Sequence, residues 1–202
     1  MYWNRLEDIQ KIKEILLKDQ IVLASSDTVI GLYGRLTEKS YDALDSLKQR
    51  KGKPYLIMIH SVSVLPKFID QPIDAKLQKI IDNCWPGPVT IIFKARADLP
   101  DYLQSPDGTI ALRMPNHKGI LSLLQSFDGL FSTSANIHTE PIVPKIEQVA
   151  QSIQQGVGAL CIDSENQVFS TLPSTIIDCS SKPIKVVRKG CFFDDRVKEL
   201  LQ

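Results

Sequence analysis

The sequence predicts one α/β domain built around a mixed β-sheet. The chain has 202 residues, which suits a single domain that buries about 70% of its unfolded surface without a disulfide or metal. Helical periodicity and short β-branched runs alternate along the whole length, with no repeat or linker between them. Turn sequences at Pro86–Pro88 and Pro106–Gly108 permit hairpins, so some neighbouring strands should be antiparallel. We therefore expect residues 1–202 to fold as one unit.

The first two helices carry the clearest boundary signals. Asn4 can cap the first helix, with Glu7 completing a capping box. Its expected apolar stripe consists of Leu6, Ile9, Ile12 and Leu16. The second helix should begin at a Ser40 cap, continue to about Arg50 and stop at Gly52.

The other elements follow from short apolar runs between turn residues. Further helices are expected from Asp74, from Pro144 to Gly156, and over Asp194–Leu201. Strands are expected at Ile21–Ser25, Tyr55–His60, Val89–Ala95, Thr109–Met114, Leu130–Ser132, Ala159–Asp163, Thr175–Asp178 and Ile184–Arg188. "WPGP" should form a type II turn with Gly87 at its third position.

The charge balance excludes a basic field over the whole protein, because 24 Lys and Arg oppose 23 Asp and Glu. The four cysteines, Cys84, Cys161, Cys179 and Cys191, form no C-x-x-C pair, so we expect free thiols in a reducing compartment rather than zinc ligands. No signal-peptide core or membrane-length apolar run occurs. We expect a cytoplasmic protein that does not contact a membrane.

Local cations could still bind anions. Lys48, Arg50, Lys51 and Lys53 lie within six residues. They could simply favour a helix C-terminus, contact nucleic acid, or line a pocket for a small polyanion. Arg113 lies in mid-strand beside small residues, where its charge requires either a structural acidic partner or a ligand carboxylate or phosphate.

Hydroxyl groups recur at strand ends. They occur at Ser26–Thr28, at Ser132–Asn136 and at Ser174–Thr175, and Arg188 follows in a later strand. Each could form an ordinary turn. Together they also suit a pocket for phosphate and carboxylate groups. The chain has no P-loop and no G-x-G-x-x-G sequence, which excludes those two nucleotide-binding classes.

Seven segments, in order, resemble motifs of the YrdC/TsaC family, the threonylcarbamoyl-AMP synthases. They are "SSDTVIGLYG", "LKQR", "WPGPVTIIF", "IALRMPNH", "STSAN", "STIID" and "VVRKG". The chain is similar to the compact single-domain form. The resemblance implies a YrdC/RibB-like fold, which is a twisted mixed sheet flanked by helices with a concave basic cavity.

The same resemblance implies a nucleotidyltransferase reaction. L-threonine, bicarbonate or carbon dioxide, and ATP with Mg²⁺ would give L-threonylcarbamoyl-AMP, diphosphate and water, without an organic cofactor. A partner enzyme would then transfer the threonylcarbamoyl group to an adenosine beside the tRNA anticodon. The resemblance also raises tRNA itself as a partner of this chain.

The family's functional residues transfer to matching positions of this sequence. The catalytic set would be Lys48, Arg50, Ser134 and Asn136. Threonine would contact Thr28, Arg113 and Thr175. ATP would contact Arg50, Thr109, Ser134, Asn136 and Arg188. No metal ligand is assigned.

The chain departs from the family pattern at Ser25, Ser26, Ile30 and Lys189, and the register of Lys53 and His60 is open. Two alternatives also remain open. One is a non-catalytic module that binds double-stranded RNA, with affinity that falls steeply with salt. The other is a HypF-like enzyme that handles carbamoyl phosphate rather than threonine.

Overall fold

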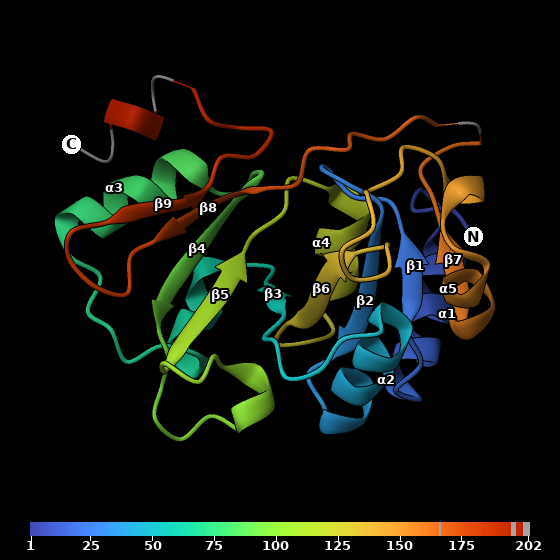
Figure 1. Ribbon diagram of the computed structural model, residues 1–202, viewed down its shortest axis with the longest axis horizontal. Coiled ribbons are helices and arrows are strands. Elements are labelled where there is room, and N and C mark those ends of the chain that lie inside the picture. The colour runs from blue at the N-terminus through green and yellow to red at the C-terminus, as the bar shows by residue number, and fades with distance from the viewer. Residues whose placement is uncertain (166, 195–196, 200–202) are drawn as a thin grey trace.

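A nine-stranded mixed sheet forms the centre of the computed structural model, which describes residues 1–165, 167–194 and 197–199 (Figure 1). The strands are β1 (Val22–Ala24), β2 (Gly31–Arg35), β3 (Leu56–Met58), β4 (Val89–Lys94), β5 (Thr109–Arg113), β6 (Leu130–Ser134), β7 (Ala159–Cys161), β8 (Thr175–Asp178) and β9 (Lys185–Arg188). Their order is β7-β1-β2-β6-β3-β5-β4-β8-β9. The pairs β7–β1, β3–β5 and β4–β8 are parallel, and the other neighbours are antiparallel. The predicted fold class, α/β with a mixed sheet flanked by helices, is confirmed.

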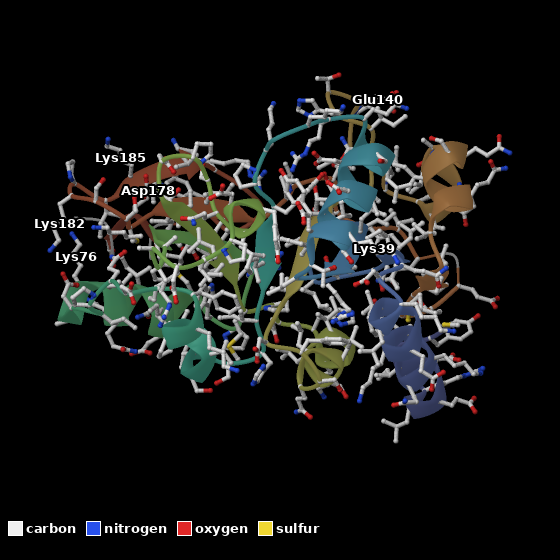
Figure 2. The ribbon with its side chains drawn as sticks, turned by 90° about the horizontal axis from the view of Figure 1, so that it is seen from below. Lys39, Lys76, Glu140, Asp178, Lys182 and Lys185 are labelled. Carbon is white, nitrogen blue, oxygen red and sulfur yellow. The ribbon has the colours of Figure 1, made fainter. Side chains whose placement is uncertain are left out.

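Helices cover both sides of this sheet. They are α1 (Leu6–Leu17), α2 (Glu38–Lys48), α3 (Ala75–Cys84), α4 (Lys118–Leu124) and α5 (Gln151–Gly156), with 3-10 turns η1 (Val62–Lys67), η2 (Asp101–Leu103) and η3 (Ile146–Gln148). Figure 2 shows α2 and α5 on one side of the sheet and α1 and α4 on the other. It also shows Lys76, Lys182 and Lys185 together at the far end, around α3 and the β8–β9 hairpin.

The two faces of the sheet differ in how much of their surface is covered. Because strand residues alternate between faces, one face presents a continuous apolar layer that packs on α2, α3 and α5. This layer includes Leu23, Leu32, Ile57, Ile91, Leu112, Phe131 and Ile177, all fully buried. The opposite face is covered by α1 and α4 only around β1, β2 and part of β6, where Val22, Ala24 and Leu130 are buried. The rest of that face holds the cavity described below.

The first two helices begin and end differently from the prediction. Arg5, not Asn4, is the N-cap of α1, and it makes no side-chain capping bond. The Tyr2 amide instead donates to Asp8 Oδ2 at 2.8 Å, because the N-terminal segment is pinned to β7. Leu6 is 81% exposed and lies off the apolar stripe.

The second helix starts earlier and ends sooner than expected. Thr37 caps α2, since its Oγ1 accepts from the Ser40 amide. Ser40 therefore lies inside the first turn. Gln49, in the left-handed region at φ 51°, ends the helix three residues before Gly52.

Other local predictions were also wrong. A cis peptide bond precedes Pro86, and Gly87 does not have the positive φ that a type II turn requires. The helix expected from Pro144 is divided into η3 and α5, because Val149 between them is extended. The central strand β2 and the short η1, η2 and α4 were not predicted. The helix expected over residues 194–201 falls partly outside the described residues.

Candidate active site

A cavity of about 320 Å³ opens on the less covered face of the sheet. Residues that face each other across strand pairs line it, including Gly31 opposite Ser134 and Tyr33 opposite Ser132. The lining continues through Met58 and Arg113 of β3 and β5 and reaches Thr90 and Ile176 of β4 and β8. Strand pairing brings these segments together, and β2, β4 and β5 each contribute every second residue because side chains alternate between the faces. Strand β6 contributes Ser132, Thr133 and Ser134 in succession.

The described part of the cavity lining has three arginines and no carboxylate. The arginines are Arg50, Arg113 and Arg188. Opposite charges about 4 Å apart attract by roughly 4 kcal/mol at an effective dielectric near 20, compared with about 1 kcal/mol in water. A guanidinium in this cavity should therefore attract an anion more strongly than a solvent-exposed lysine such as Lys182, which pairs with Asp74 at 2.9 Å at the far end of the molecule.

Arg113 is fixed on three sides by the protein. It is 2% exposed, and its Nη2 lies 2.6 Å from Asp27 Oδ1. Its Nη1 donates to Thr28 Oγ1 and its Nε to the Gly87 carbonyl oxygen, both at 3.0 Å. The structural ion pair considered from the sequence is thus present. Arg113 also lines the cavity, so a ligand in the cavity would lie next to this paired guanidinium.

The backbone at Gly87 supports this arginine. The Gly87 amide donates to the Met114 carbonyl oxygen at 2.8 Å, next to Arg113 in the chain. A Cβ atom at position 87 would lie 2.5 Å from the Cys84 carbonyl oxygen. Position 87 therefore requires glycine, because a side chain there would collide with the Cys84 carbonyl oxygen. This close approach of the two backbone segments places the Gly87 carbonyl oxygen against Arg113 Nε.

Arg188 lines the β8–β9 side of the cavity with a chain of hydroxyls. Its Nε donates to the Ser174 carbonyl oxygen at 3.0 Å and its Nη2 to Ser174 Oγ at 3.2 Å. Ser174 Oγ lies 2.8 Å from Thr90 Oγ1. Burial, and then the nearby charge of Arg113, lower the pKa of Arg188. A bound anion would raise the pKa of Arg188 again, because a nearby negative charge favours the protonated guanidinium.

Lys48 joins α2 to the loop after β6. Its ammonium donates to the carbonyl oxygens of Ser134 and Asn136 at 2.6 and 2.5 Å, and to Asn136 Oδ1 at 3.0 Å. Ser134 Oγ also donates to Asn136 Oδ1. Burial, with a smaller effect of Arg50, lowers the pKa of Lys48 to about 8. Lys48 lies behind the cavity wall and fixes the loop that carries Ser134.

Arg50 is held over an aromatic ring. Its guanidinium lies 4.2 Å from the ring centre of Tyr55, and its Nε donates to the Tyr55 hydroxyl at 3.3 Å. That hydroxyl donates to Asp45 Oδ1 at 2.7 Å. Beside it, Lys53 Nζ lies 3.0 Å from His138 Nε2, and the Lys53 charge is the main cause that lowers the pKa of His138. The rim near Arg50 is therefore cationic.

The structure brings most of the predicted site residues together. Thr28, Arg50, Arg113, Ser134 and Arg188 line the cavity, and Lys48 and Asn136 bond to its wall. Thr109 does not line it, because its hydroxyl donates to Asp107 in a turn at the opposite end of β5. Thr175 does not line it either. Its hydroxyl donates to the Phe192 carbonyl oxygen and accepts from the Gly190 amide. The roles of all these residues remain predictions.

Three polar lining residues were missed from the sequence, namely Tyr33, Tyr55 and Thr90. Ser26, Ser132, Thr133 and Ser174 belong to the hydroxyl-bearing segments that were expected to form a pocket, but no individual role was assigned to them. Period-two alternation could have found Tyr33, since it follows Gly31 by two residues. Nothing in the sequence separates Ser174 from Thr175 without the strand register.

The departures from the family pattern have local structural roles. The Ser25 hydroxyl accepts from Trp3 Nε1 at 3.1 Å and donates to Asp163 Oδ2 at 2.8 Å, which fastens the N-terminal segment. Ser26 Oγ accepts from the Thr28 amide at 3.1 Å and fixes the turn before Thr28. Ile30 is a core residue at 1% exposure. Lys189 lies over the Phe193 ring at 5.1 Å.

His60 does not line the cavity, and its buried Nδ1 has no hydrogen-bond partner within the described residues. The described part of the chain contains no group of three His, Cys, Asp or Glu side chains arranged to hold a metal ion. No described helix is both long enough and apolar enough to cross a membrane. The four cysteines are free thiols, and only Cys191 is exposed.

Comparison with known proteins shows the family to which this chain belongs. The family model Sua5_yciO_yrdC, described as "Telomere recombination", matches residues 14–190. The chain belongs to the Sua5/YciO/YrdC family. A Methanocaldococcus jannaschii protein named "Putative threonylcarbamoyl-AMP synthase" is 29% identical over 189 residues, which cover 93% of this chain and 87% of that protein.

Solved structures share the fold at lower identity. P. abyssi Sua5 complexed with L-threonine superposes with a TM-score of 0.85 at 23% identity, over 96% of this chain and 57% of that chain. The present chain therefore spans somewhat more than half of that Sua5 chain. Full-length HypF in a phosphate- and nucleotide-bound form gives a TM-score of 0.77 at 16% identity, but only 29% of that chain is covered. These comparisons favour neither of the two alternatives considered from the sequence.

Proposed function

We propose that this member of the Sua5/YciO/YrdC family is a threonylcarbamoyl-AMP synthase. The observation that carries the proposal is the cavity with three arginines and no carboxylate among its described lining residues. Both reactants of this reaction, the carbamate of threonine and ATP, are anionic. Fixed cations that are already in place lower the cost of bringing them together.

The threonine carboxylate suits the Arg113 wall. Arg113 is held by Asp27, Thr28 and Gly87, so its direction is fixed before a ligand arrives. A guanidinium grips a carboxylate through two parallel hydrogen bonds. Thr28 Oγ1 lies 3.0 Å from Arg113 Nη1 and lines the same wall. Thr175, which faces the C-terminal segment instead, would act through the position of Ser174.

The phosphates of ATP, bound with Mg²⁺ as part of the substrate, suit the Arg50 and Ser134 side. The threonine amine and bicarbonate form a carbamate with loss of water. A carbamate oxygen attacks the α-phosphorus of ATP, the bond to the bridging oxygen breaks, and diphosphate leaves. Arg50 and the Ser134 hydroxyl stabilise the charge on phosphate oxygens, and Lys48 with Asn136 holds Ser134 in place. Arg188 is available to the nucleotide on the β8–β9 side of the cavity.

The cellular context is part of the proposal. The product is an activated acyl-adenylate, so a partner enzyme that transfers the threonylcarbamoyl group to adenosine in tRNA would consume it. We propose a cytoplasmic location, in keeping with the free thiols.

Diphosphate release tests the proposal. Purified protein with ATP, L-threonine, bicarbonate and Mg²⁺ should release diphosphate only when threonine is present. Arg50→Ala should reduce turnover at least a hundredfold. Arg96→Ala removes a half-buried arginine that pairs with Asp98 away from the cavity, so it is the matched control and should turn over normally. No threonine-dependent release, together with no threonine binding by calorimetry, would rule out the proposed function.

A further inference from the structure

The cavity contains the buried hydroxyl of Tyr33. Tyr33 in β2 is 2% exposed, and its ring packs with side chains that lie under α1 and α4. It nevertheless lines the cavity. No hydrogen bond of ordinary length and angle joins its hydroxyl to another described residue, although the hydroxyls of Ser26 and Ser132 lie near enough to lower its pKa. A buried hydroxyl left unpaired by the protein costs free energy, so such groups usually have a partner in the functional state.

The backbone makes room for this hydroxyl. A Cβ atom at Gly31 would lie 3.0 Å from the Tyr33 hydroxyl oxygen and 3.2 Å from the Thr133 carbonyl oxygen. The phenol therefore folds back along β2 over Gly31. Gly31 pairs with Ser134 across the sheet, so the hydroxyl is directed along the cavity floor toward the loop that Lys48 fixes.

The protonation state of the phenol limits what it can bind. Burial raises the pKa of Tyr33, and the nearby charge of Arg113 opposes the shift only partly. The group is neutral at physiological pH and can both donate and accept a hydrogen bond. It suits a neutral hydroxyl of a ligand better than an anionic oxygen, for which Arg50, Arg113 and Arg188 provide charged partners.

We propose that the Tyr33 hydroxyl binds the β-hydroxyl of the amino-acid substrate and makes the site selective for β-hydroxy amino acids. This inference rests on the proposed function. Threonine offers three polar groups: its carboxylate suits Arg113, its amine becomes the reacting carbamate, and its β-hydroxyl is the neutral group that remains.

Tyr33→Phe tests the assignment because it removes only the oxygen. Calorimetry would measure the Kd of L-threonine and of L-2-aminobutyrate, which lacks the β-hydroxyl and adds no bulk. The wild type should bind threonine more tightly than aminobutyrate. In the variant, threonine should bind about five- to tenfold more weakly, as expected for one hydrogen bond, and the affinity for aminobutyrate should change less than twofold.

A structural readout and a matched control accompany the binding data. Tyr33→Phe should unfold at the same temperature as the wild type or higher, because it removes an unpaired buried hydroxyl. Tyr102→Phe, at a tyrosine outside the cavity, should leave both affinities unchanged.

The outcomes separate this inference from the function on which it rests. Unchanged threonine affinity in Tyr33→Phe, or equal weakening of threonine and aminobutyrate, would overturn the β-hydroxyl assignment while the wild type still binds threonine. Absence of threonine binding by the wild type would overturn both the inference and the proposed function.

Discussion

The buried pair of Asp27 and Arg113 provides a quantitative test of the site's electrostatics. The ion pair has a 2.6 Å contact, and the side chains of Arg113 and Asp27 are 2% and 11% exposed. Removing one partner of such a pair leaves an uncompensated charge and costs about 3–5 kcal/mol. For a protein of this size, 1 kcal/mol corresponds to roughly 2–4 °C in melting temperature. Asp27→Asn and Arg113→Met should therefore each lower the melting temperature by at least about 6 °C.

The double variant separates the pair's interaction from other losses. With both charges removed, no uncompensated charge remains, so the combined cost should be well below the sum of the two single costs. We expect a coupling free energy of about 3 kcal/mol from urea unfolding of the wild type, both single variants and the double variant. If the single effects add within about 0.5 kcal/mol, the charge of Arg113 is balanced elsewhere and the description of this wall is wrong.

Three further predictions concern other parts of the chain. The pKa of Lys48 lies at about 8, below its ordinary value of 10.5, so between these pH values the unfolded chain binds more protons than the folded chain. The contribution of Lys48 to the free energy of unfolding should therefore rise with pH through that window. Turnover should instead fall above about pH 8, because the ammonium that fixes Ser134 loses its proton. A turnover profile that is flat from pH 7 to 10 would refute this. Ser25→Ala removes the hydroxyl between Trp3 and Asp163. It should lower the free energy of unfolding by about 1 kcal/mol, measured by thermal unfolding, and leave diphosphate release unchanged. An unchanged melting temperature would show that the hydroxyl does not hold the N-terminal segment. A thiol reagent should modify Cys191 faster than the other three cysteines of the native protein, since Cys84, Cys161 and Cys179 are buried and Cys191 is exposed. Burial raises the pKa of Cys191 as well, so access of the reagent sets the difference in rate; fast reaction of a second thiol would contradict the described packing.

Much of the fold could be predicted because it depends on local pattern. The strand runs and the amphipathic helices gave the α/β class and the approximate element positions. The failures depend on contacts between distant residues. Asn4 is a good cap by its sequence, but the N-terminal segment pairs with β7 and brings Tyr2 to Asp8 instead. The seven-residue helix α4 is too short to show a reliable period.

Site residues that belong to sequence motifs could be predicted. Those whose position depends on the register between strands were harder to predict. Lys48, Ser134 and Asn136 do meet, although Lys48 lies behind the wall rather than in it. Asp27 is the partner of Arg113, and only the fold brings these residues together across 86 positions of sequence. Thr175 and Ser174 differ by one residue, and the strand's pleat places Ser174 in the cavity.

The most direct test of the central claim follows one carbon atom. Protein incubated with ATP, Mg²⁺, L-threonine and ¹³C-labelled bicarbonate should form threonylcarbamoyl-AMP, detected by mass spectrometry, with the label in the carbamoyl carbon. Its amount should equal the diphosphate released. ATP cleavage without labelled product, or a product that forms equally well when threonine is omitted, would contradict the account.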